Sequence, residues 1–216
     1  KINLIQGYNE KDEAVKIIEH ISKVKEEKKI SYNSFLILYR TNAQSRIIED
    51  TLIKNGILYT IIGGVKFYDR KEVKDLLAYM RLLVNPNDKI SFDRIINFPV
   101  RGIGKTTVEK LYKNLKSDNI LLSLDKIENI GIGKKQLSGL NAFSTLMRLY
   151  TKRSKKESPS IVIKDLLFEL KLKEYYTNQN TLDSVDRWAN IQECISGIVD
   201  YENNTESPTL SGYLEE

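Results

Sequence analysis

The sequence predicts an α/β fold in its first third, followed by a mostly helical part. Three short apolar runs, at about residues 2–5, 35–39 and 58–62, alternate with two segments whose apolar residues recur at helical spacing. Beyond them the apolar spacing becomes helical, and two Gly-Ile-Gly turns each open a helical pattern. We therefore expect a partial parallel sheet of β-α-β-α-β order in residues 1–62 and an all-α domain with helix-hairpin-helix-like turns in residues 63–216.

The first helix is expected to begin at about Glu10, after a strand near Ile2 to Ile5. Five apolar residues share one face of this helix: Ala14, Ile17, Ile18, Ile21 and Val24. A sheet of three strands leaves its edges unpaired, so these strands need further strands beside them.

The second helix follows a short strand and begins with a capping signal. Phe35 to Tyr39 is a continuous apolar run, which is typical of a strand covered on both faces. Thr41 and Gln44 then have the spacing of a capping box, so we expect a helix from about Ala43 to Asn55-Gly56.

Arg40 and Asn42 lie where the predicted strand gives way to this helix. In open α/β sheets, ligands bind beyond the carboxyl ends of the strands. A guanidinium offers a fork of donors that suits phosphate, and the start of a helix adds backbone N–H groups beside it. The pattern indicates a phosphate contact, although a surface arginine beside a turn-forming asparagine would give the same residues.

A third helix is expected from about Lys71 to Leu83. Asp69 and Glu72 again have capping-box spacing, and six apolar residues follow before Pro86: Val73, Leu76, Leu77, Met80, Leu83 and Val84. We expect the aromatic pair before this helix, Phe67 and Tyr68, to serve packing at a hinge rather than base stacking.

The next segment ends in Gly104-Lys105-Thr106, which resembles the end of an ATP-binding loop. A Walker A loop needs a glycine five positions before this ending, and Pro99 stands there. The dinucleotide-binding pattern fails as well, because Thr107 occupies the place of its third glycine or alanine. What remains is a Gly-hydrophobic-Gly turn that opens a helix, which is the sequence of a helix-hairpin-helix.

Such a turn suits the backbone of a DNA duplex. Glycines let the chain approach a phosphate, and helix N-terminal N–H groups bind it without reading bases. The unit recurs at Ile130 to Lys135, and this repetition favours duplex binding over two ordinary tight turns. The candidate duplex-binding residues are Arg101, Gly102, Gly104, Lys105, Thr106, Thr107, Gly131, Gly133 and Lys134.

Composition limits the other function classes. The chain has 216 residues, and its one cysteine, Cys194, and one histidine, His20, provide neither an internal disulfide nor a metal cluster of familiar spacing. We therefore assign no metal ligand and no catalytic residue. No apolar run approaches ~18 residues, and the N-terminus lacks a signal-peptide pattern, so we expect a cytoplasmic protein with no membrane partner.

The formal net charge of +5 is a weak argument for nucleic acid, but its distribution is informative. The end of the chain is acidic, through Asp200, Glu202, Glu206, Glu215 and Glu216. The middle is basic, through Arg101, Lys105, Lys110, Lys113, Lys116, Lys134, Lys135, Arg148, Lys152, Arg153, Lys155 and Lys156. This basic segment is a candidate phosphate-facing surface.

Four blocks of this sequence, in one order, resemble the middle of a UvrD/PcrA/Rep-type superfamily 1 DNA helicase. They are LYRTNAQSR, GGVKFYDRKEVKDLLAYMRLL, NPND and RGIGKTT. The resemblance implies that residues 1–62 begin a RecA-like domain called 2A, and that residues 63–216 form the inserted domain 2B, truncated at its C-terminus. It also implies a parent enzyme that couples ATP hydrolysis to 3′-to-5′ movement on DNA in repair or replication.

The resemblance also assigns roles to residues. In the family, the first block contacts single-stranded DNA, which implies this role for Arg40, Asn42 and Arg46, and the glycine turn touches the duplex ahead of the fork. The partners implied are DNA and the remaining helicase domains. ATP and Mg²⁺ belong to the parent, because the Walker A and Walker B motifs lie outside these residues, so the fragment needs no cofactor and should be inactive alone. The alternative is a stand-alone helix-hairpin-helix DNA-binding or protein-interaction module without a motor.

Overall fold

The structure is a computed structural model, and it describes residues 2–115, 119–124, 131–179 and 181–215. The chain forms two compact units, Lys1–Arg70 and Lys71–Glu216. The domain boundary expected from the sequence, after residue 62, lies shortly before this division. Three residues that the sequence analysis names lie outside the described residues: Lys116, Ile130 and Glu216.

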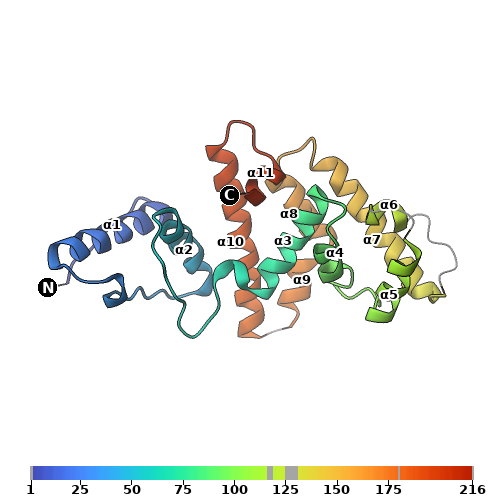
Figure 1. Cartoon of the computed structure of the whole chain (residues 1–216), viewed down its shortest axis with the longest axis horizontal. Helices are drawn as coiled ribbons and strands as arrows, with labels where there is room; N and C mark the ends of the chain where they lie inside the picture. The colour runs from blue at the N-terminus through green and yellow to red at the C-terminus, as the bar shows by residue number, and fades with distance from the viewer. Residues whose placement is uncertain (1, 116–118, 125–130, 180, 216) are drawn as a thin grey trace. The chain divides into compact units, whose positions relative to one another are not determined.

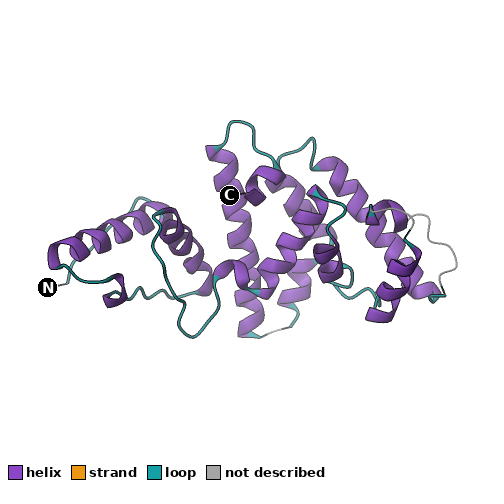
Figure 2. Cartoon of the chain, viewed as in Figure 1, coloured by secondary structure: helices purple, strands orange, loops and turns teal. Residues whose placement is uncertain are grey.

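The α/β fold expected for the first part of the chain is wrong. Figure 2 shows helices joined by loops, and no strand occurs in the described residues. The three runs expected to form a partial RecA-like parallel sheet, at 2–5, 35–39 and 58–62, are not paired with one another as strands. A strand exists only through hydrogen bonds to a neighbouring strand, and a local apolar pattern cannot supply that neighbour.

The expectation that the run Phe35 to Tyr39 is covered on both faces is also wrong. Leu36 and Leu38 are 70% and 84% exposed, whereas Ile37 packs against a small core formed by Ile18, Leu52 and Ile57. Alternate side chains of an extended chain point to opposite sides. One side of the run therefore contacts the helices and the other side lies in solvent.

The helices of the first unit begin close to the positions expected from the sequence. Helix α1, Glu10–Lys28, starts after Asn9, whose side chain accepts a hydrogen bond of 2.8 Å from the N–H of Asp12. Helix α2, Ser45–Lys54, follows a short 3₁₀ turn, Asn42–Gln44, and the expected capping box of Thr41 and Gln44 is confirmed there. Two further 3₁₀ turns of this unit are Tyr32–Ser34 and Phe67–Asp69.

The second unit is built around α3, Lys71–Val84, as Figure 1 shows. The helix expected over 71–83 is confirmed, and it packs against α4, α7, α10 and α11. Most of its surface is covered by these neighbours. Its buried apolar residues are Val73, Leu76, Leu77, Ala78, Tyr79, Met80, Leu82 and Leu83.

The other helices of this unit follow α3 along the chain. In chain order they are α4 Lys89–Ile95, α5 Lys105–Asn114, α6 Ile120–Leu124, α7 Lys134–Arg153, α8 Pro159–Glu169, α9 Leu172–Thr177, α10 Leu182–Asn204 and α11 Leu210–Glu215. The helices expected after both glycine turns are confirmed as α5 and α7.

The central position of α3 predicts a large cost for removing its side chains. Leu76 is 1% exposed, so Leu76→Ala should lower the free energy of unfolding by about 2–5 kcal/mol through lost burial and a residual cavity. Ile90 in α4 is 84% exposed, and Ile90→Ala should change the free energy by no more than about 0.5 kcal/mol. Urea unfolding followed by circular dichroism measures both values, and equal losses would contradict the central role of α3.

Candidate nucleic-acid interface

The first glycine turn lies between α4 and α5, and hydrogen bonds to one side chain hold it in place. Gly102 has a φ of +75°, a left-handed conformation that glycine adopts without steric cost. The side-chain oxygen of Asn97 accepts hydrogen bonds from the N–H groups of Arg101 and Ile103, at 2.8 and 3.0 Å. Ile103 is 2% exposed and anchors the turn in the core.

Helix α5 begins at this turn and presents its first residues to solvent. Gly104 is the N-cap and contributes no side-chain cap. The first N–H groups of a helix have no partner inside it and carry a partial positive charge, so they can receive an anion. Lys105 and Thr106 are exposed beside them, whereas Thr107 is 7% exposed and faces the interior.

The second glycine turn repeats this geometry before α7. Gly131 has a φ of +69°, and Gly133 is an N-cap without a side-chain cap. Lys134 and Lys135 are exposed in the first turn of the helix. Both turns therefore combine a left-handed glycine, an uncapped helix start and an exposed lysine.

The structure brings the two turns together. The ammonium of Lys110 in α5 donates a hydrogen bond of 2.5 Å to the carbonyl of Gly131. The side chain of Lys135 in α7 passes beside Gly102, since a Cβ built on that glycine would lie 3.7 Å from Cε of the lysine. We call half-buried Gly102 and the exposed residues here the glycine-turn surface: Gly102, Gly104, Lys105, Thr106, Gly131, Gly133, Lys134 and Lys135.

Arg101 differs from its basic neighbours because its guanidinium points inward. It lies 5.1 Å from the ring centre of Phe143 and donates 2.8 Å to the hydroxyl of Tyr79. Burial raises the pKa of Tyr79 to about 12, against the opposing effect of the guanidinium. The guanidinium also donates to four carbonyls, those of Ile95, Ile96, Phe98 and Pro99.

The residues of the first unit that were predicted to bind single-stranded DNA differ from one another in their exposure to solvent. Arg40 and Asn42 are exposed, and the side-chain oxygen of Gln44 accepts from the N–H of Arg40 at 2.9 Å. Arg46 is 4% exposed and pairs with Asp50 at 3.1 Å. The solvent-facing part of this motif is therefore Arg40 and Asn42.

Arg70 and Glu49 hold this motif in place, a supporting role that the sequence did not predict for either residue. The guanidinium of Arg70 donates to the carbonyl of Asn42 at 2.7 Å and to the hydroxyl of Ser45 at 2.9 Å. The carboxylate of Glu49 accepts from the N–H of Phe67 at 3.1 Å. Phe67 is fully buried, which confirms the packing expected for it. The burial of a polar side chain is the signal for such residues, and it exists only in the folded structure.

The second unit also contains a groove between α8, α9 and α10 that the sequence did not predict. Its volume is about 790 Å³. Its lining includes the exposed ring of Phe168 and the half-buried ring of Trp188. The full lining is Lys164, Leu167, Phe168, Lys173, Glu174, Trp188, Gln192, Ile195, Ser196, Val199 and Asp200.

The described part of the chain has neither of two other features that would bear on function. There, no group of three or more histidine, cysteine, aspartate or glutamate side chains is placed to hold a metal ion. None of the helices described has both the length and the apolar character that crossing a membrane requires.

Residues 1–216 match the family described as UvrD-like helicase C-terminal domain. The chain belongs to this family.

The helicase relatives match almost all of the chain. It is 36% identical over 216 residues to the ATP-dependent DNA helicase PcrA of Bacillus subtilis strain 168, covering 99% of this chain and 29% of the relative. It is 39% identical over 218 residues to the helicase of the same name from Staphylococcus aureus strain Mu50, covering 99% of this chain and 30% of that relative. The chain thus spans about three tenths of the length of the curated relatives it matches.

The inward position of Arg101 leads to a stability prediction. Arg101→Ala should lower the free energy of unfolding by about 1.5–3 kcal/mol, because charge-assisted hydrogen bonds to buried carbonyls are lost. Lys105→Ala, four residues further along, should change it by no more than about 0.5 kcal/mol, since its side chain is exposed. Urea titrations of both variants test this, and a larger loss for Lys105→Ala would refute the inward role.

Proposed function

We propose that this chain is the DNA-holding part of a UvrD-like helicase, and that its two units contact different forms of DNA. The second unit binds duplex backbone through the glycine-turn surface. The first unit binds single-stranded backbone through Arg40 and Asn42. In the family's terms, residues 1–62 correspond to the start of domain 2A and residues 63–216 to domain 2B.

The observation that carries the duplex assignment is the pairing of the two glycine turns. Lys105 and Lys134 are exposed at two uncapped helix starts that lie beside each other. These groups can donate to phosphate oxygens, and contacts to phosphate carry no sequence information. The binding mode is therefore non-specific and electrostatic.

We infer that the parts that bind and hydrolyse ATP lie elsewhere in the full-length protein. Both relatives carry the printed name ATP-dependent DNA helicase, and this chain covers only 29% and 30% of them. ATP and Mg²⁺ are held by other parts of such a protein, and this chain supplies none of the catalytic groups. Its contribution to unwinding and to 3′-to-5′ movement is to hold both DNA strands at the fork.

A second candidate function is favoured by the groove between α8, α9 and α10. Its lining rings, exposed Phe168 and half-buried Trp188, and its volume of about 790 Å³ suit an apolar segment of a protein partner. This function requires no DNA contact, so the duplex-binding measurement separates the two candidates.

The duplex assignment predicts a steep dependence on salt. The chain should bind a fluorescent hairpin duplex with a dissociation constant near 10⁻⁴–10⁻⁶ M, and unrelated sequences should bind equally. The logarithm of the affinity should fall against the logarithm of salt concentration with a slope of roughly 3–5, from a few phosphate contacts at each turn. Lys105→Ala combined with Lys134→Ala should lower the affinity and reduce the slope by about 1.8, which is about 0.9 for each cation.

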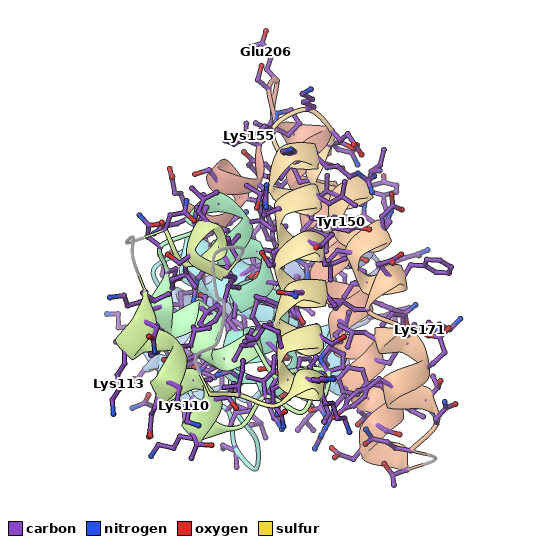
Figure 3. The ribbon with its side chains drawn as sticks, turned by 90° about the vertical axis from the view of Figure 1, so that its right-hand side faces the viewer. Lys110, Lys113, Tyr150, Lys155, Lys171 and Glu206 are labelled. Carbon is purple, nitrogen blue, oxygen red and sulfur yellow. The ribbon has the colours of Figure 1, made fainter. Side chains whose placement is uncertain are left out.

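The matched control removes two lysines from the other end of the same helix. Lys155 and Lys156 are exposed just beyond the C-terminal end of α7, roughly 30 Å from Lys134 for a helix of this length. Figure 3 shows Lys155 at the opposite end of the unit from Lys110. The double variant Lys155→Ala and Lys156→Ala has the same net charge as the test variant. Equal losses of affinity in the two variants would mean that total charge alone explains the effect. Salt-independent binding would overturn the duplex assignment and favour the protein partner.

The single-strand assignment predicts a loss in the full-length protein. Arg40→Ala should weaken binding to an oligonucleotide strand by about 1.5–3 kcal/mol, the range for a charge-assisted hydrogen bond, and should slow unwinding. Exposed Lys11 lies on α1 of the same unit, and Lys11→Ala controls for the loss of one charge. Fluorescence anisotropy measures the affinity. An unchanged affinity for Arg40→Ala would show that Arg40 is a surface residue without a contact to the strand.

A further inference from the structure

Lys110 contacts the protein itself, although it belongs to the basic segment of the sequence. Its ammonium donates to the carbonyl of Gly131 at 2.5 Å, across 21 positions of the chain. Gly131 is the left-handed glycine of the second turn, so the direction of this carbonyl depends on the turn conformation. The lysine of α5 therefore connects the helix that follows the first turn to the backbone of the second turn.

Gly139 provides an independent contact between the same two elements. It lies inside α7, where glycine is less favourable than alanine by about 1 kcal/mol, so its presence has no helix-forming benefit. A Cβ built on Gly139 would lie 2.8 Å from the carbonyl oxygen of Arg101, which is backbone of the first turn. The helix passes the turn at a distance that only glycine allows.

We propose that Lys110 and Gly139 are positioning residues that hold the two glycine turns as one preformed, two-part site for duplex backbone. This inference rests on the duplex binding proposed above. Two turns fixed relative to each other engage a stiff duplex together, because binding at one turn places the other turn at its own phosphate. Without these contacts each turn would have to be ordered separately on binding, at a cost in affinity.

Lys113 gives a matched control for Lys110. Both lysines extend from α5, three positions apart, and both are exposed (Figure 3). Lys110→Met and Lys113→Met remove the same charge from the same helix, but only the first removes the hydrogen bond to Gly131. For Gly139, the control is Ser138→Ala on the exposed side of α7.

The experiment measures binding of the whole chain to a fluorescent hairpin duplex over a range of salt concentrations. Lys110→Met should weaken binding several-fold more than Lys113→Met. Gly139→Ala removes no charge, yet it should also weaken binding several-fold, whereas Ser138→Ala should not. Lys110→Arg, which keeps a donor for the Gly131 carbonyl, should restore most of the affinity. Thermal melting by circular dichroism checks that each variant is folded.

A double-mutant cycle tests the coupling directly. In the native chain, the separate losses from Lys105→Ala and Lys134→Ala should sum to more than the loss of the double variant, because either change disables a joint site. In the Lys110→Met background the losses should become additive. A merely structural role for Lys110 would leave this coupling unchanged.

The outcomes separate this inference from the function on which it rests. If the native chain binds duplex and depends on Lys105 and Lys134, but Lys110→Met equals Lys113→Met and the cycle is unchanged, the positioning role is refuted and the duplex assignment stands. If the native chain shows no salt-dependent duplex binding, both are overturned. Should Gly139→Ala fail to fold, the exposed pair Lys110 and Lys113 still decides the question.

Discussion

The hydrogen bonds of the Arg101 guanidinium are the interaction on which the candidate duplex site depends. One cation joins the hydroxyl of Tyr79 in α3, the carbonyls at the end of α4 and the ring of Phe143 in α7. Guanidinium provides several donors in a fixed plane, which an ammonium cannot match. The backbone of the first turn is thus held by a guanidinium that points into the molecule. Its hydrogen bonds to several oxygen acceptors offset the cost of removing the charge from water.

Cations of both units divide into a supporting set and an exposed set. Arg70 and Arg46 are buried in the first unit, where Arg70 holds the carbonyl of Asn42 and Arg46 pairs with Asp50. Arg40 of the first unit and Lys105 of the second unit belong to the exposed set. Buried arginines can hold the backbone beneath an exposed site in place, because one guanidinium donates to several oxygens at once.

The sequence predicted helices and turns well, because their signals are local. The capping box at Thr41 and the glycine turns specify their conformation within a few residues, and the structure contains both. The predicted strands failed because pairing depends on distant segments, which an apolar run such as Phe35 to Tyr39 does not identify. The sequence also could not show that Arg101 points inward whereas Lys105 points outward, because both cations belong to the same short motif. The inward direction of Arg101 depends on its contacts with Tyr79 of α3 and Phe143 of α7, which are distant in the sequence.

The proposed contacts also suit a protein that moves along DNA. Each glycine turn offers backbone N–H groups and few cations, so few phosphates are neutralised and non-specific affinity stays in the micromolar range or weaker. Contacts to phosphate carry no sequence information, and the same contact is available at every step along the duplex. Rigid spacing between the turns would then gain affinity from geometry rather than from additional charge. A duplex held in this way can be released and rebound at the next position without the cost of breaking base-specific contacts.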